Sequence, residues 1–266
     1  MILYVLLTHR PADEVRAYLE DFERVLPGRR CVVCFGGTHE GFEGLRHIPD
    51  AFFVEDPALR SRVGQSYNEV LALAWERVVA PDPSCSSVHL LEYDHVVLSP
   101  RYEAELLELM AGDRVGLLAA SCADHTLVNW CHGIDLLDDH ELAEHLREIS
   151  VRDQEIPSIW GGLGSGMTIG REALEDFCRR ARDLPRYMEA YIPTAVYHLG
   201  YRVLGAPESA TLFDHVRFGP PYEQEDVMRL ARDGALALHP VKERATQQEV
   251  VAIANGNRTR PNPTAS

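Results

Sequence analysis

Two acidic residues, Glu92 and Asp94, come directly after the strand-like run Val88-His-Leu-Leu91. A carboxylate in apolar surroundings is costly without a partner, so this position calls for a counter-charge. Their i, i+2 spacing at a strand-to-turn junction lets both carboxylates approach one small volume. Hard oxygen ligands suit Mg²⁺ or Mn²⁺, which in turn bridge phosphate oxygens. The pattern predicts a divalent metal site, and the alternative is an acidic strand end that simply faces solvent.

The elements around this motif alternate between strand-like and helix-like runs. Strands are expected at residues 2–7, 31–35, 51–54, 88–91, 115–120, 167–169 and 201–204. Helices are expected after Pro11, after the capping boxes at Ser66 and Thr246, and at residues 102–110, 139–149, 171–181, 187–199 and 223–233. This alternation predicts an α/β fold with a mainly parallel central sheet flanked by helices. Ligands of such sheets bind at the carboxyl ends of the strands.

The composition is that of an ordinary globular chain, with 45% hydrophobic and 25% charged residues. The net charge of −15, with no cluster of Lys and Arg, argues against nucleic acid or an anionic membrane as a partner. An anionic nucleotide remains compatible, because a bound cation reverses the local charge. No apolar run reaches the length of a membrane span, and residues 1–7 are too short for a signal peptide, so we expect a soluble, cytoplasmic protein.

The cysteines are scattered and mostly lie in apolar stretches, which predicts reduced core residues. Cys31 and Cys34 have C-x-x-C spacing, but in an extended strand their side chains point to opposite faces. No second pair completes a zinc site.

The segment Leu-Leu-Glu92-Tyr93-Asp94-His95-Val-Val-Leu-Ser-Pro100 resembles the Asp-x-Asp segment of GT-A glycosyltransferases, especially family-2-like members. The resemblance implies a single GT-A (Rossmann-like) domain over residues 1–254. Residues 1–120 would be its nucleotide-binding half, residues 121–254 its acceptor-binding half, and residues 255–266 a flexible tail. It makes Asp94 the principal metal ligand. Because Glu92 replaces the first Asp, its role is reduced to a ribose, sugar or water-mediated contact.

The same resemblance places further residues around the donor. They are polar or charged residues at loop ends or beside the acidic motif: Thr8, His9, Arg10, Asp56, Asn68, Tyr93 and Lys242. For Asp56 and Asn68, capping or solvation accounts for the residue type equally well.

Downstream residues fall in the order that the resemblance implies. Glu189, at a helix start, corresponds to the catalytic base, although a carboxylate there also favours the helix dipole. His239 would complete the metal shell and Lys242 would face the diphosphate. His215 competes with His239, and the extended lead-in over residues 235–238 favours His239.

An acceptor site is expected around the glycine-rich turn at residues 160–166, which lacks the Gly-Lys-Ser/Thr ending of a phosphate loop. We expect it to be a flexible wall between donor and acceptor, with Gly161 and Gly162 beside the sugar. Trp130 and Trp160 could stack on an acceptor ring, or could be core residues.

Together these features predict a metal-dependent, hexosyltransferase-like enzyme. It would use Mn²⁺ or Mg²⁺ to transfer a sugar from a nucleotide-sugar donor to a small-molecule or glycan acceptor, with inversion if Glu189 is the base. The alternatives are a nucleotidyltransferase, for which the loop Thr8-His-Arg-Pro11 lacks the usual glycines, and a catalytically silent binding module. Sugar, base, acceptor and oligomeric state are not encoded in these motifs.

Overall fold

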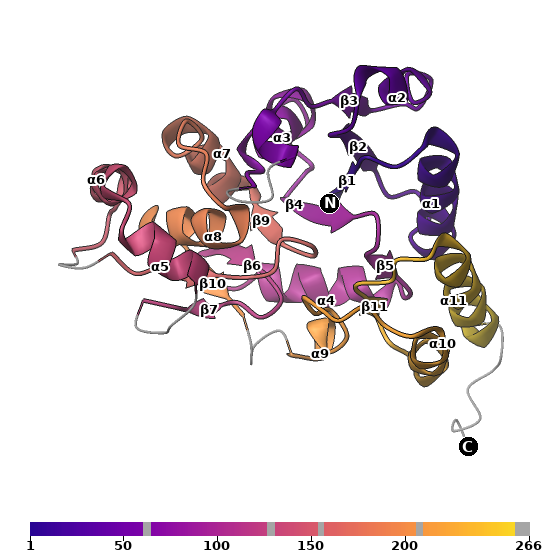
Figure 1. Ribbon diagram of the computed structural model, residues 1–266. Helices are drawn as coiled ribbons and strands as arrows, with labels where there is room; N and C mark the ends of the chain where they lie inside the picture. Colours follow the sequence, from indigo (N-terminus) through magenta and orange to yellow (C-terminus); the bar gives the residue numbers. More distant parts are fainter. Residues whose placement is uncertain (61–64, 127–130, 154–156, 206–209, 259–266) are drawn as a thin grey trace.

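The central feature of the computed structural model is a seven-stranded sheet (Figure 1). The structure describes residues 1–60, 65–126, 131–153, 157–205 and 210–258. In spatial order the strands are β10 (Arg202–Leu204), β6 (Val115–Leu118), β9 (Thr168–Gly170), β4 (Ser87–Glu92), β1 (Ile2–Thr8), β2 (Cys31–Phe35) and β3 (Ala51–Phe53). All pair in parallel except β9, which is antiparallel to both β4 and β6. The predicted mainly parallel sheet is confirmed.

The strand order reverses at β1. From there the chain builds outward to β2 and β3 on one side, and then crosses back to place β4 on the other. Leu7 of β1 lies beside Glu92 of β4, so the carboxyl ends of these two strands share one edge. A topological switch point of this kind opens a crevice at which α/β proteins bind ligands.

Helices cover both faces of the sheet (Figure 1). On one face lie α1 (Ala12–Val25), α4 (Arg101–Met110), α10 (Gln224–Asp233) and α11 (Arg244–Arg258). On the other lie α3 (Asn68–Ala74), α6 (His140–Ile149), α7 (Arg171–Arg180) and α8 (Met188–His198). Shorter elements complete the described chain: α2 (His39–Glu43), a 3₁₀ turn (Pro57–Arg60), a π-helical turn (Trp75–Val79), β5 (Val96–Val97), β7 (Ala123–Asp124), α5 (Cys131–Leu137), β8 (Trp160–Gly161), α9 (Ala210–Phe213) and β11 (Ala237–Leu238).

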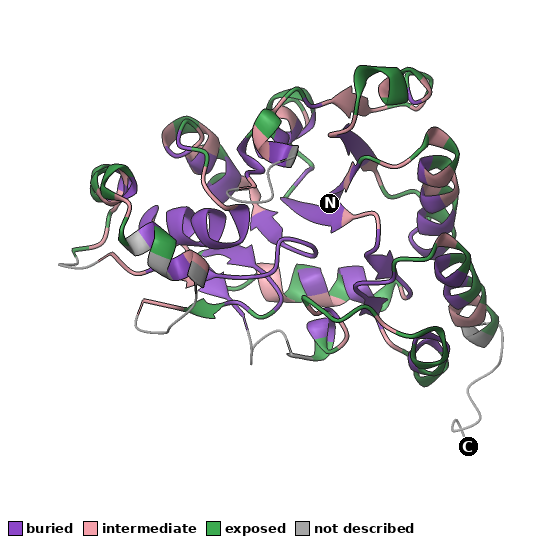
Figure 2. Cartoon of the chain, viewed as in Figure 1, coloured by how far each residue is buried: buried purple, intermediate pink, exposed green. Residues whose placement is uncertain are grey.

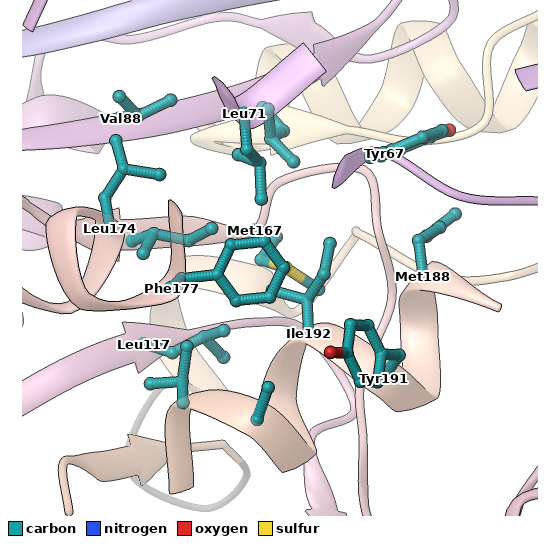
Figure 3. Packing of buried hydrophobic residues seen from close by; sticks show 14 of the residues in the cluster. Tyr67, Leu71, Val88, Leu117, Met167, Leu174, Phe177, Met188, Tyr191 and Ile192 are labelled. Atoms are coloured by element: carbon teal, nitrogen blue, oxygen red, sulfur yellow. The ribbon is translucent and has the colours of Figure 1, made fainter. Parts of the chain in front are cut away.

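Each face of the sheet has its own hydrophobic core, and Figure 2 shows the buried strands between partly exposed helices. In the core of Figure 3, Val88 and Leu117 from the sheet face Phe177 of α7 and Ile192 of α8. Every residue of α8 except Tyr197 is buried. A helix that is buried nearly all round holds its side chains in fixed positions. This applies to Glu189, the acidic residue in the first turn of α8.

The cysteine predictions hold for the residues described. Cys34 belongs to the core on one face of the sheet and Cys31 packs against the core on the other. Cys31, Cys34, Cys85 and Cys178 are free thiols. Among the described helices, none combines the length and apolar character needed to cross a membrane.

Two predicted helix starts are wrong. Helix α3 begins at Asn68 with Tyr67 at the N-cap position, and Ser66 Oγ accepts only the nearby Asn68 N–H. Helix α11 begins at Arg244, so Thr246 lies inside its first turn. The side chain of Arg244 bonds both Gln247 and Asp21 of α1, which fixes the earlier start. Because α11 runs to Arg258, the predicted tail also begins too early.

Asn68 has a structural position. Its side chain is 1% exposed, and Nδ2 donates to the carbonyl oxygens of Arg182 (2.7 Å) and Leu184 (3.2 Å). These bonds join α3 to the segment between α7 and α8.

We predict that Asn68→Ala lowers the free energy of unfolding by about 1–3 kcal/mol, because two buried carbonyl groups lose their donor. Urea denaturation measures the change. Glu69→Ala is the control, since Glu69 forms an exposed ion pair with Arg182 that contributes at most about 1 kcal/mol. An unchanged stability in Asn68→Ala would contradict the structural role.

Candidate metal and donor site

The metal-binding prediction depends on whether residues far apart in the sequence meet. Strand β4 ends at Glu92, and the chain turns through Asp94 into β5. Strand β11 pairs antiparallel with β5, and His239 follows it directly. The backbone N–H of Val241 also donates to the carbonyl of Asp94 (2.9 Å). β5 and β11 form a separate two-stranded sheet, and this pairing brings His239 next to the turn that follows β4.

Glu92, Asp94 and His239 form a compact cluster of ligand atoms. His239 Nε2 lies 3.4 Å from Asp94 Oδ1 and 3.7 Å from Glu92 Oε2. The candidate ligand atoms of the three residues all lie within 4.8 Å of one another. Asp94 is 0% exposed and His239 is 4% exposed, whereas the Glu92 side chain is 29% exposed. Among the described residues this is the one group with metal-ligand geometry.

Two candidate ligand atoms of the cluster have no hydrogen-bond partner, one on His239 and one on Asp94. His239 Nδ1 lies 2.9 Å from the Arg217 carbonyl, which can only accept, so Nδ1 carries the proton. Nε2 then points its lone pair at the carboxylates when the ring is neutral. Both Nε2 of His239 and Oδ1 of Asp94 are buried and have no hydrogen-bond partner. A backbone carbonyl that fixes the tautomer is the usual support of a histidine that binds metal. The residues fit a divalent cation.

The protonation states reflect this concentration of charge. Burial favours the neutral form of Asp94, but the nearby positive groups of His239 and Lys242 outweigh it and lower the pKa of Asp94 to about 2. Burial also acts to lower the pKa of His239, whereas Asp94 and Glu92 raise it to about 9. Without a cation the imidazolium thus supplies the missing positive charge. A metal ion must displace that proton.

Lys242 pairs with Asp94 rather than standing free. Its Nζ bonds Asp94 Oδ2 and lies 5.4 Å from the centre of the Tyr93 ring. The side chain is 46% exposed. Lys242 therefore sits at the edge of the cluster, where a flexible ammonium group can also reach a phosphate.

A buried histidine network supports the turn that carries Asp94. Tyr102 Oη lies 3.2 Å from His89 Nε2 and 3.3 Å from His95 Nε2, and His95 Nδ1 lies 3.1 Å from Ser165 Oγ. Burial lowers the pKa of both imidazoles, to about 3 for His89, so they stay neutral. The network was missed at the sequence level, because nothing in the spacing of these residues indicates that their rings meet.

A cavity of about 580 Å³ opens at the switch point beside the cluster. Of the predicted donor residues, Thr8, His9, Glu92 and Tyr93 line it. The lining also includes Gln65 and Tyr67, next to the predicted donor residue Asn68. Its other members, which the sequence analysis did not assign to the donor, are Leu7, Gly36, Gly37, Thr38 and Leu59. Gly36 and Gly37 directly follow β2. In the sequence, this position at the carboxyl end of a strand is the one feature that indicates a place near the ligand. A cavity of this size suits a nucleotide.

Tyr67 connects the cavity to the cluster. Its Oη donates to Glu92 Oε1 at 2.6 Å, and its ring is buried. This bond holds one oxygen of Glu92 and leaves Oε2 facing His239.

Other predicted donor residues lie outside the cavity lining. Arg10 pairs with Glu14 (2.7 Å) and lies over the Tyr93 ring, and Asp56 Oδ1 accepts the N–H of Ala58 (2.8 Å) at the start of the 3₁₀ turn. Asn68 is turned to backbone carbonyls. The Asp56 side chain makes a local backbone bond, and the Asn68 side chain bonds backbone carbonyls of a distant segment. Such bonds compete with ligand contacts.

Glu189 is held at the start of α8 by the glycine-rich segment. Gly164 N–H donates to Oε1 (2.9 Å) and Tyr187 Oη donates to Oε2 (2.7 Å). Pro193, four residues on, has no N–H to offer the carbonyl of Glu189. Gly162 N–H donates to that carbonyl instead, at 2.9 Å. Because of Pro193, the carbonyl of Glu189 has no partner within the helix and is free to accept the bond from the glycine segment.

The glycine segment is buried, which corrects the expectation of a flexible wall. Leu163 N–H donates to Ala120 O (2.9 Å) and Gly166 N–H to Leu90 O (2.8 Å), so residues 161–166 bridge β4 and α8. Gly166 has φ +88°, a left-handed conformation that favours glycine.

Burial raises the pKa of Glu189, while the bonds from Gly164 and Tyr187 partly offset the shift. A raised pKa is typical of a carboxylate that exchanges protons near neutral pH. Glu189 lines a second cavity, of about 490 Å³, together with the predicted acceptor residues Gly161 and Gly162. Trp160 is not part of this lining and packs on Tyr197, with ring centroids 5.4 Å apart. Trp130 lies outside the described residues.

The sequence matches no model of a known protein family and no curated protein. Several solved structures align with this chain. One is the mannosyltransferase PcManGT from Pyrobaculum calidifontis in complex with GDP-Man and Mn²⁺. It has 14% sequence identity, the alignment covers 99% of this chain and 77% of that one, and the TM-score is 0.45. The galactosyltransferase LgtC, in complex with donor and acceptor sugar analogs, has 12% identity over 98% of both chains and a TM-score of 0.40. A glycosyltransferase involved in glycosylation of the major capsid of PBCV-1 has 10% identity over 95% of this chain and 98% of that one, and a TM-score of 0.45.

We predict that Asp94→Asn and His239→Ala each weaken Mn²⁺ binding at least about tenfold, because each removes one ligand of the cluster. Calorimetric titration of Mn²⁺ in the presence of a nucleoside diphosphate measures the change. His215→Ala is the matched control, since His215 meets His239 only through a backbone bond.

The same titration has a defined pH dependence. Since Mn²⁺ displaces the His239 proton, wild-type affinity rises as the pH increases towards 9. Equal Mn²⁺ binding by wild type and His239→Ala would remove His239 from the metal site.

Proposed function

We propose that this protein is a metal-dependent glycosyltransferase of the GT-A type, family-2-like. It would transfer a sugar from a nucleoside diphosphate to an acceptor hydroxyl. The observation that carries the proposal is the pair of buried, unpartnered atoms, Asp94 Oδ1 and His239 Nε2, that face Glu92. They lie at the switch point of a parallel sheet, and Glu92 also lines the 580 Å³ cavity. A cation site beside a nucleotide-sized cavity fits a diphosphate substrate.

The cluster and its neighbour Lys242 provide for the leaving group. Asp94 and His239 would hold Mn²⁺ or Mg²⁺, with Glu92 as a third or water-mediated contact. When bound, the cation neutralises negative charge on the diphosphate. Lys242 adds a second positive charge at the exposed edge of the cluster, next to Tyr93. The metal ligands Asp94 and His239 are thus buried, whereas the Lys242 ammonium is exposed. This arrangement suits an anionic diphosphate that enters from solvent.

The donor cavity supplies orientation. Thr8, at the carboxyl end of β1, and Tyr93, after β4, lie on adjacent strands, so both can contact the nucleoside. Gly36 and Gly37 offer a wall of backbone without side chains. Tyr67 keeps Glu92 directed at the cluster, so it is a positioning residue for the sugar side of the donor.

Glu189 is the proposed base. The acceptor oxygen attacks the anomeric carbon, the bond from that carbon to the diphosphate oxygen breaks, and the acceptor proton passes to the Glu189 carboxylate. Its oxygens each accept one bond, from Gly164 and Tyr187, and retain lone pairs for the acceptor proton. Attack from the face opposite the leaving group gives inversion.

Calorimetry and turnover assays with a panel of nucleotide sugars, each with and without Mn²⁺, test the function. We expect Mn²⁺-dependent binding and turnover of at least one nucleotide sugar. In Asp94→Asn, turnover falls by at least about 10²-fold with folding intact. His215→Ala keeps wild-type turnover. Preferential Mn²⁺-dependent turnover of free nucleoside triphosphates would indicate a nucleotidyltransferase, and no metal-dependent heat or turnover would indicate a silent module.

The role of Glu189 predicts a specific pH profile. Because its pKa is raised, the acid limb of kcat/KM lies above the ordinary range of a glutamate. Tyr187→Phe removes a hydrogen bond that favours the carboxylate, so the pKa rises further and the limb moves to higher pH. Glu189→Gln lowers kcat by about 10²–10⁴-fold. An unmoved acid limb in Tyr187→Phe would argue against Glu189 as the titrating group.

A further inference from the structure

Phe218 is the most exposed large apolar side chain among the described residues. It is 81% exposed, in the loop between α9 and α10, whereas most aromatic side chains of this chain are buried or half-buried. An aromatic ring in water loses the stabilisation that burial would give it. Its position therefore needs a reason other than folding.

The ring lies on the rim of the cavity that contains Glu189. Phe218 forms one part of the lining, and Gly161 and Gly162 form another, in which only backbone faces the space. Tyr187 and His132 stack on each other, with ring centroids 4.0 Å apart and planes at 28°, and they line the same cavity. The cavity thus has aromatic walls, a glycine wall and one carboxylate.

The charge of the cavity restricts what it can hold. Within the described part of the chain its lining contains no Lys or Arg; the other described members are Ser121, His125 and Leu163. Burial lowers the pKa of His125, which keeps that imidazole neutral near pH 7. The carboxylate of Glu189 would repel an anion, and no described lining residue carries a fixed positive charge to offset it. Among the described lining residues, a phosphorylated or carboxylated acceptor group would therefore meet no Lys or Arg, only the imidazoles of His125 and His132.

The loop that carries Phe218 is anchored in the metal cluster. The carbonyl of Arg217, the preceding residue, accepts the Nδ1 proton of His239, and Arg217 N–H donates to the carbonyl of His239 (3.1 Å). The guanidinium of Arg217 stacks over Tyr222, 3.7 Å from the ring centre. These contacts fix the backbone next to Phe218, so the exposed ring is presented from a held position.

We propose that Phe218 and the stacked pair His132–Tyr187 form the acceptor site for an uncharged sugar ring. The apolar face of the ring would stack on Phe218, and one hydroxyl would point to Glu189. Aromatic side chains suit this role because a pyranose presents C–H groups on its faces and hydroxyls at its edge. The inference rests on the proposed function and specifies its acceptor.

Steady-state kinetics with a fixed, saturating donor and Mn²⁺ test the acceptor site. The acceptors are methyl glycosides of common hexoses and the same sugars as 6-phosphates. We expect turnover of at least one neutral glycoside, with its 6-phosphate a poorer substrate by at least about tenfold. In Phe218→Ala the acceptor KM rises about tenfold while the donor KM stays within about twofold, and Phe218→Trp restores the acceptor KM.

Val151→Ala is the matched control, because Val151 is apolar and 63% exposed but is not among the residues that line the cavity. We expect its acceptor KM to equal that of the wild type. If Phe218→Ala still turns over the donor and its acceptor KM is unchanged, the proposed acceptor site is wrong, but the proposed function stands. A preference for phosphorylated acceptors, or no turnover of any neutral glycoside, would also contradict the acceptor site. An altered oligomeric state in Phe218→Ala would contradict it too, because the ring would then be a protein–protein contact. No Mn²⁺-dependent donor turnover in the wild type would overturn the proposed function and the acceptor site with it.

Discussion

The structure around the site depends on one buried charge. Asp94 is fully buried, and its Oδ1 atom has no hydrogen-bond donor. An ionised carboxylate in that position is tolerated only if positive charge is close. The imidazolium of His239 and the ammonium of Lys242 supply it here. Strand β11 and the Arg217 carbonyl serve to bring His239 to this place and hold its ring.

A second constraint joins the cluster to the proposed base. The glycine segment bonds to Leu90 of β4 at one end and to Glu189 of α8 at the other. Pro193 makes this possible, because it leaves the Glu189 carbonyl free of its helical partner. The two halves of the site are therefore connected through backbone hydrogen bonds rather than through loop side chains. Replacing Gly166, with its positive φ, would disturb the connection next to His95.

Local sequence patterns predicted much of the fold and part of the site. Apolar runs and turn residues located β1, β2, β4 and α8. The spacing of Glu92 and Asp94 indicated a metal site, and the resemblance to GT-A glycosyltransferases added Glu189 and His239. Three of the four meet in one cluster. Asp56 and Asn68 illustrate the limit, since a polar side chain near a loop end serves backbone groups as readily as ligands. Tyr67, Phe218 and the histidine network depend on contacts between distant segments, which no local pattern encodes.

The central claim is that the unpartnered atoms of Asp94 and His239 face a divalent cation. Crystals of the protein grown with Mn²⁺ and a nucleoside diphosphate, measured at the manganese absorption edge, test it directly. We expect one anomalous peak at about 2.0–2.6 Å from Asp94 Oδ1 and His239 Nε2, in contact with diphosphate oxygens. A fully ordered nucleotide with no anomalous peak at these atoms, or with manganese held elsewhere, would contradict it.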